Sequence, residues 1–249
     1  MWIGDRDIRT REGSASSRDG ASLAMVTTES TPTIRRGLAM AIIRGVLFFA
    51  GTAIVARQVL GDGVDLFGGS GPALAIIAAL LLCDAVGTSL ALWRVGRQTP
   101  ATLGWPSVHV GRDVVIGVIG FAVCAAWLVL VMLAVGGTAA VGEVLDAIVG
   151  WSPTQRASFV VIGICGAAIA EESLYRGYLQ PALVSKLGVV GGILLTSLLF
   201  SLLHFNFNPV SVVSKFLLGC TYGLIAWRTG SLVAPAVTHA LVWVLIGAA

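Results

Sequence analysis

Charged residues are scarce in this 249-residue chain. They make up 12% of the sequence, against about 25% in a typical soluble domain. Hydrophobic residues account for 56%, and the mean hydropathy is +0.90. This composition excludes an ordinary soluble protein and predicts an all-α, polytopic helical membrane protein. The net charge is only +3, and no basic face interleaved with aromatic side chains occurs, so nucleic-acid binding has no support.

Paired cysteines and an apolar leader are also missing. The four cysteines fall in four separate apolar stretches, without CxxC spacing. We expect them to be small core residues rather than disulfides, metal ligands or nucleophiles. Residues 1–34 contain no apolar segment, so we expect a disordered polar tail rather than a signal peptide. Translation could also begin at Met25.

Seven apolar stretches follow this tail, and most are close to the roughly 20 residues that a helix needs to cross a bilayer. They cover approximately 37–56, 72–93, 114–135, 157–183, 189–207, 212–227 and 231–248. Arginine and lysine are concentrated in alternate connections, at Arg35, Arg36, Arg94, Arg97, Arg112, Lys186 and Arg228. The positive-inside rule therefore predicts an integral cell-membrane protein with its N-terminus in the cytoplasm.

Three charged residues interrupt the fourth stretch, in EESLYR at 171–176. Each charge at mid-bilayer costs about 2.5–3.5 kcal/mol, so the cluster predicts a function or a packing role. Glu172 and Arg176 are four residues apart and are expected to pair on one helix face, whereas Glu171 faces elsewhere. Glu172 is then neutralised by the arginine, and Glu171 is left open, without this partner. A general base and its structural neighbour need such different surroundings. The alternative is a cluster that only fixes helix packing.

Two histidines fall in later apolar stretches. A tight connection near Leu187 and Gly188 predicts a helical hairpin, in which Glu171 and His204, each 16 residues from the turn, lie about 24 Å from it. His239 follows Pro235, which is expected to kink the last helix.

These residues allow two chemistries. Glu171 and His204 could activate a water while His239 holds an oxyanion, or the three could bind zinc. No HExxH motif is present, so zinc is the weaker alternative, and we expect no metal and no other cofactor.

A further pair of charges lies in the first two stretches. Arg44 is eight residues past Arg36, and Asp84 is ten residues before Arg94. In antiparallel spans both then lie about 12–15 Å from the same ends. This equal depth predicts a buried ion pair, with an arginine that snorkels to the headgroups as the alternative.

Three motifs occur in order along the second half of the chain: EESLYRG at 171–177, FSLLH at 200–204 and WRTGSLVAPAVTHAL at 227–241. They resemble the EExxxR, FxxxH and HxxxN/D motifs of the CPBP family, the CAAX-protease and bacteriocin-processing (Abi) membrane proteins. The resemblance covers about residues 155–245. It divides the chain into a tail at 1–34, three membrane helices with their loops at 35–154, and a CPBP-like core at 155–249 with its site inside the bundle.

The resemblance implies a glutamate-type intramembrane endopeptidase that needs no metal and acts on a peptide or membrane-protein substrate. Glu171 and His204 would activate the water, with Glu172 and Arg176 as supporting partners, and His239 would stabilise the oxyanion. Position 243 departs from the third motif, because Trp243 stands where the family has asparagine or aspartate.

This departure leaves two functions open, a slow protease and a catalytically weak or inactive immunity or regulatory protein. A transporter has less support, because no inverted repeat is evident. The substrate, its prenylation and the oligomeric state remain open.

Overall fold

The structure is a computed structural model that describes residues 31–60, 71–105, 107–149, 152–205 and 207–248. Within these ranges the chain is helical and contains no strand. The all-α prediction is therefore confirmed. Most of the expected polar tail at 1–34, including Met25, lies outside the described residues.

Helices cover the predicted apolar stretches. The first half contains α1 (Ile34–Leu60), α2 (Gly71–Arg94), the short α3 (Pro100–Leu103) and α4 (Val110–Val149). The second half contains α5 (Pro153–Ile162), the π-helix η1 (Gly163–Leu179), α6 (Gln180–Leu202), α7 (Pro209–Thr229) and α8 (Val233–Ala248).

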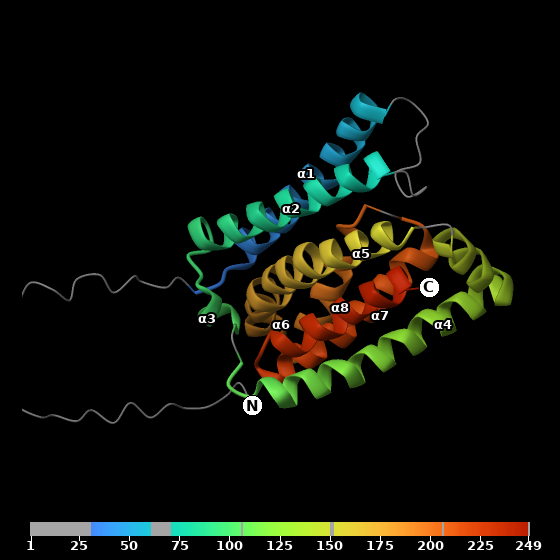
Figure 1. The fold of residues 1–249 in the computed structure, drawn as a ribbon. Helices are drawn as coiled ribbons and strands as arrows, with labels where there is room; N and C mark the ends of the chain where they lie inside the picture. Colours follow the sequence, from blue (N-terminus) through green and yellow to red (C-terminus); the bar gives the residue numbers. More distant parts are fainter. Residues whose placement is uncertain (1–30, 61–70, 106, 150–151, 206, 249) are drawn as a thin grey trace, which may run out of the picture.

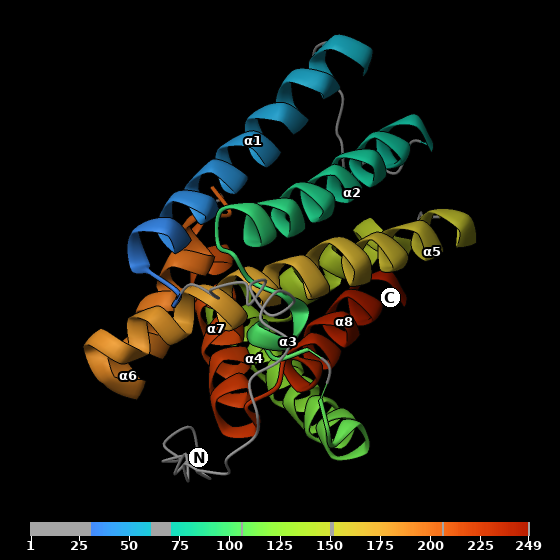
Figure 2. The same cartoon turned by 90° about the vertical axis from the view of Figure 1, so that its left-hand side faces the viewer.

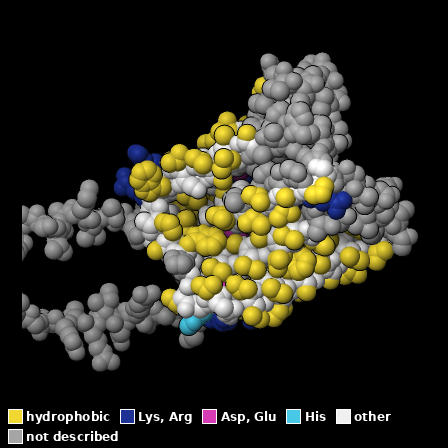
Figure 3. Space-filling model, in the orientation of Figure 1, with side chains coloured by type: hydrophobic (Ala, Val, Ile, Leu, Met, Phe, Trp, Pro, Cys, Tyr) yellow, Lys and Arg dark blue, Asp and Glu magenta, His cyan; other side chains and the backbone are white. Residues whose placement is uncertain are grey.

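Several of these helices are suited to a bilayer. Those long and apolar enough to cross it, among the described residues, are Val110–Ala134, Ala168–Leu202 and Pro209–Thr229, and a shorter apolar helix spans Val233–Leu245. Hydrophobic side chains cover most of the described surface in Figure 3. Leu47, for example, is 67% exposed. Such apolar exposure is stable where lipid rather than water surrounds the bundle, and the chain is an integral membrane protein.

The long apolar stretch Ala168–Leu202 is broken at Gly188, where φ is 70° and ψ is 175°. This backbone region is essentially restricted to glycine. The break lies at the connection predicted near Leu187. Phe200, which follows the break on α6, packs against Tyr175 of η1, which precedes it. The expected hairpin is therefore confirmed.

The π-helix η1 lies at the centre of the bundle. It contacts α1 and α2 from the first half of the chain and α6, α7 and α8 from the second. Figures 1 and 2 show α1 and α2 running side by side, while α4 packs along α7 and α8 away from that pair. The charged segment of η1 is therefore enclosed by helices from both halves of the chain.

The expected kink at Pro235 is wrong. Helix α8 begins at Val233, so the proline lies in the first helical turn. A proline is tolerated there, because the N–H group that it lacks has no partner within the helix. The residue helps to begin α8 rather than bending it.

A close approach of α4 and α8 gives a test of the packing. A Cβ atom at Gly117 would lie 2.7 Å from Val237 Cβ and 2.8 Å from the Ala234 carbonyl oxygen. We expect Gly117→Ala to push the helices apart and to lower the free energy of unfolding by about 1–3 kcal/mol. Thermal unfolding in detergent micelles measures this. Gly111→Ala is the matched control, since nothing lies within 4 Å of that position on the same helix. Equal stability of the two variants would contradict the packing account.

Candidate active site

The segment that carries EESLYR is a π-helix and not the α-helix that the sequence suggested. A π-helix bonds residue i to residue i+5, and its wider turn rotates successive side chains by less than the 100° of an α-helix. Glu171 and Glu172 consequently both reach His239 on α8. The prediction that Glu171 and Glu172 face different sides of the helix is therefore only partly correct. Helices of this type are rare and are frequent at functional sites.

Glu172 is the neutralised carboxylate. Arg176 Nη1 lies 3.4 Å from Glu172 Oε1, and both side chains are completely buried, so the predicted pair is confirmed. His239 Nδ1 lies 2.9 Å from the same oxygen. Arg176 also donates through Nη2 to the carbonyl oxygen of Gly219 at 3.2 Å, and its guanidinium stacks over the Phe200 ring. Glu172 and Arg176 thereby join η1 to α6, α7 and α8.

Glu171 is the carboxylate at which the other predicted site residues meet. His204 Nε2 lies 3.8 Å from Glu171 Oε1, and His239 Nε2 lies 3.9 Å from Glu171 Oε2. The Glu171 side chain is 7% exposed. The structure therefore brings together the three residues predicted to be catalytic.

His204 lies just past the end of α6, in a turn, and its side chain remains 19% exposed. Its Nδ1 is 2.5 Å from the Phe200 carbonyl oxygen, which can only accept, so Nδ1 carries the proton. In the neutral ring Nε2 is then an acceptor, as is the Glu171 carboxylate. Two acceptors 3.8 Å apart cannot bond to each other, but each can accept one O–H group of the same water. The arrangement is thus suited to hold a water.

His239 is held on two sides. Its Nδ1 faces the Glu172 carboxylate, an acceptor, and therefore donates to it. Its ring stacks on Tyr222, with the centroids 4.8 Å apart and the planes at 22°. These contacts direct Nε2 towards Glu171 Oε2.

Arg44 contacts the candidate site, which its predicted pairing with Asp84 did not indicate. Its Nη2 donates to Glu171 Oε1 at 2.8 Å, so Glu171 is itself paired with an arginine, and the prediction that this carboxylate is left open is wrong. Asp84 accepts from the same guanidinium at 3.0 Å from Nε and 2.6 Å from Nη2, so the predicted Arg44–Asp84 pair is confirmed. Counting residues from the helix ends places Arg44 and Glu171 at different depths. The helices cross obliquely (Figure 2), so residue counts alone did not indicate this contact.

A second cation was also missed. Lys215 on α7 interacts electrostatically with Glu171 and His204, and its Nζ donates to Ser211. Within the described residues, no three His, Cys, Asp or Glu side chains are grouped to hold one metal ion. A metal ion at Glu171 would also be repelled by the Arg44 guanidinium. The zinc alternative therefore receives no support from this geometry.

Trp243 lies against the beginning of η1. A Cβ atom at Gly163 would stand 2.3 Å from Trp243 Cδ2, so the indole occupies the space above that glycine. Gly163 is eight residues before Glu171. A role for Trp243 in the reaction stays a prediction.

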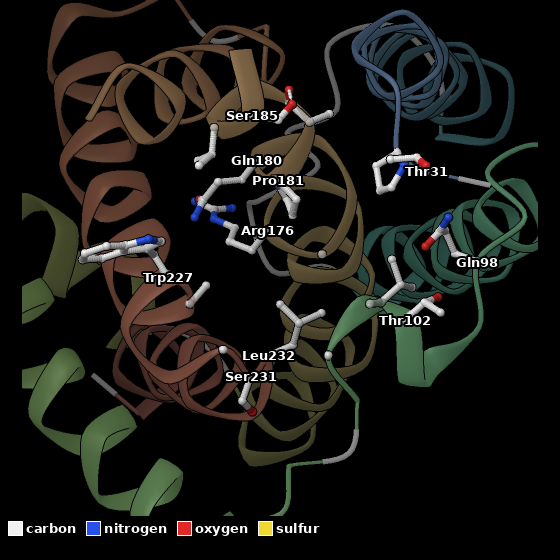
Figure 4. A pocket seen from close by; sticks show the side chains of 18 of the residues that line it. Thr31, Gln98, Thr102, Arg176, Gln180, Pro181, Ser185, Trp227, Ser231 and Leu232 are labelled. Carbon is white, nitrogen blue, oxygen red and sulfur yellow. Dashed lines mark hydrogen bonds between the residues drawn. The ribbon is translucent and has the colours of Figure 1, made fainter. Parts of the chain in front are cut away.

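Two cavities border the charged cluster. One of about 830 Å³ has Arg176, Gln180 and Trp227 on one side of its wall, and Gln98 and Thr102 lie across from them in Figure 4. The other, about 780 Å³, lies between α1 and α2 and is lined by Arg44 and Asp84. The cluster is therefore approached from both halves of the bundle.

The buried pair of Glu172 and Arg176 gives a stability prediction. Arg176→Ala leaves the Glu172 charge without its cation, which we expect to cost about 3–5 kcal/mol of unfolding free energy. Unfolding in detergent, with Arg35→Ala as the control at an exposed arginine, measures this. An Arg176→Ala protein as stable as that control would show that the pair does not support the fold.

Comparison with known proteins adds one result. Residues 153–245 match the family model described as "Type II CAAX prenyl endopeptidase Rce1-like". No curated protein and no solved structure matches the chain. The matched segment contains Glu171, His204 and His239, while α1, α2 and α4 lie outside it. The resemblance found in the sequence is thereby confirmed: residues 153–245 form a domain of the Rce1-like type II CAAX prenyl endopeptidases, within the CPBP family.

Proposed function

We propose that this protein is an intramembrane endopeptidase in which Glu171 and His204 activate a water that hydrolyses a peptide bond. The observation that carries the proposal is the 3.8 Å separation of Glu171 Oε1 and His204 Nε2 inside an apolar bundle. Both atoms are acceptors, so one water can donate to both. The Rce1-like domain supports the same reaction class.

The proposed reaction conserves atoms and charge. The water oxygen bonds to the carbonyl carbon while its proton passes to the Glu171–His204 pair. The C–N bond then breaks, and the same pair returns the proton to the leaving nitrogen. General acid–base catalysis of this kind contributes about 10²–10⁴-fold to a rate.

His239 is proposed to stabilise the oxyanion. Its Nδ1–H group is held by Glu172, so a protonated ring would present Nε2–H to the negative charge that develops on the carbonyl oxygen. Glu172 and Arg176 act indirectly, because they hold this ring. Trp243 is proposed to weaken the site, since the family's asparagine or aspartate is absent.

We also propose that the N-terminal end of α1 faces the cytoplasm. Figure 1 shows that α1 begins, α2 ends and α4 begins at the same end of the bundle. Arg35, Arg36, Arg94, Arg97 and Arg112 belong to these segments, and the positive-inside rule assigns such an end to the cytoplasm.

The alternative is a membrane immunity or regulatory protein that binds without turnover. The observation in its favour is Trp243, whose indole fills the space above Gly163. The buried charges at 171–176 favour the protease instead, because ionisable residues inside membrane spans most often mark a functional site.

The first functional prediction concerns Glu171. We expect the purified protein to cleave a reporter peptide that ends in a CAAX sequence, tested with and without a farnesyl group. Glu171→Gln and His204→Ala should abolish cleavage while both variants still insert, since a glutamine amide cannot take the water's proton and alanine lacks the imidazole that accepts from the water. His109→Ala, at the exposed start of α4, is the matched histidine control.

Proteomics of wild-type and Glu171→Gln cells extends this test to natural substrates. We expect a membrane-proximal cleavage that disappears in the variant. Wild-type activity in Glu171→Gln would show that the catalytic assignment is wrong. If neither the reporter nor any cellular protein is cleaved, binding without turnover becomes the better account.

The second prediction concerns Trp243. We expect Trp243→Asn to raise kcat/KM for the reporter, because it restores the family's donor, and one oxyanion donor is typically worth about 10²–10³-fold in rate. Glu171→Gln in the same background should remove this activity. Trp93→Asn, at an exposed tryptophan of α2, is the control. A fall in activity would instead show that the indole itself is needed.

A further inference from the structure

The contacts of Glu171 extend beyond the Rce1-like domain. Arg44 and Asp84 belong to α1 and α2, which lie outside residues 153–245. Arg44 nevertheless donates to Glu171 Oε1 at 2.8 Å. We propose that Arg44, fixed by Asp84, is a positioning residue that holds the Glu171 carboxylate in the orientation needed for water activation. This inference rests on the proposed function.

The Glu171 carboxylate needs a donor to fix its orientation. The last torsion of a glutamate side chain has broad minima, so its two oxygens exchange places unless a donor fixes one of them. Among the described residues, Arg44 is the one that donates a hydrogen bond to Glu171. The two histidines lie at 3.8 and 3.9 Å, beyond hydrogen-bonding distance. Arg44 therefore determines that Oε1 faces His204 and that Oε2 faces His239.

The Arg44 guanidinium is held rigidly by Asp84. Asp84 Oδ2 accepts from both Nε and Nη2 of Arg44, at 3.0 and 2.6 Å. The Arg44 and Asp84 side chains are only 9% and 6% exposed, so few other rotamers are open to them. A planar guanidinium bound at two of its nitrogens loses its orientational freedom. The α1–α2 pair thus presents a fixed N–H group to η1.

The charge of Arg44 is shared between two carboxylates. An arginine that paired with Glu171 alone would neutralise it and weaken it as a base. Here one guanidinium serves two carboxylates, because Nη2 contacts both Asp84 and Glu171. The three groups together keep one negative charge. Asp84 therefore offsets part of the Arg44 charge that acts on Glu171.

Activity variants test this role. We expect Arg44→Gln to lower kcat for the CAAX reporter by about 10²-fold, with KM changed less than twofold, since a misplaced catalytic group impairs the chemical step. Arg44→Lys should recover about tenfold, because it retains the charge but not the fork geometry. Asp84→Asn should lower kcat less than Arg44→Gln. The double variant should be no worse than Arg44→Gln alone, since Asp84 acts through Arg44. Arg35→Gln, at an exposed arginine on the same helix, is the control.

Two outcomes would overturn the inference while the proposed function stands, provided that Glu171→Gln is inactive. One is a wild-type kcat in Arg44→Gln. The other is an equal loss in Arg44→Gln and Arg44→Lys that follows their thermal unfolding temperatures, which indicates a structural role only. A rise in KM at constant kcat would assign Arg44 to substrate binding and also reject positioning. If Glu171→Gln is active, or if the wild type cleaves neither the reporter nor a protein found by proteomics, the proposed function and this inference fail together.

Discussion

The structure depends on the pairing of charges inside an apolar bundle. Each charge in a bilayer is costly, and an unpaired buried charge costs several kcal/mol more than a paired one. Two linked groups meet this requirement. Asp84 and Glu171 share Arg44, while Glu172 lies between Arg176 and His239. Since the contacts of Arg44 with Asp84 and Glu171, and of Glu172 with His239, join different helices, the arrangement of the bundle and that of the site are determined together.

This pairing explains why η1 occupies the centre. It carries two carboxylates and one arginine, and their partners come from α1, α7 and α8. The Rce1-like domain supplies one part of this set, and the α1–α2 pair supplies the other. The boundary of the matched segment therefore marks where sequence similarity ends. The functional unit that we propose extends beyond it and includes α1 and α2.

The sequence predicted what depends on local pattern and depth. Hydropathy predicted the helices, Gly188 the hairpin, and equal distances from the helix ends the Arg44–Asp84 pair. It did not predict that η1 is a π-helix, because helix type depends on packing around a segment more than on its composition. The contact of Arg44 with Glu171 was missed because helix crossing angles cannot be obtained by counting residues.

The central claim is that a water, and not Glu171 itself, attacks the peptide bond. Cleavage in water labelled with oxygen-18, followed by mass spectrometry of the product and of the enzyme's Glu171 peptide, tests it most directly. Direct attack by water places one labelled oxygen in the single new carboxylate that each cleavage creates, and none in Glu171 after many turnovers. Labelled oxygen in the Glu171 side chain would reveal a covalent acyl intermediate and contradict the account.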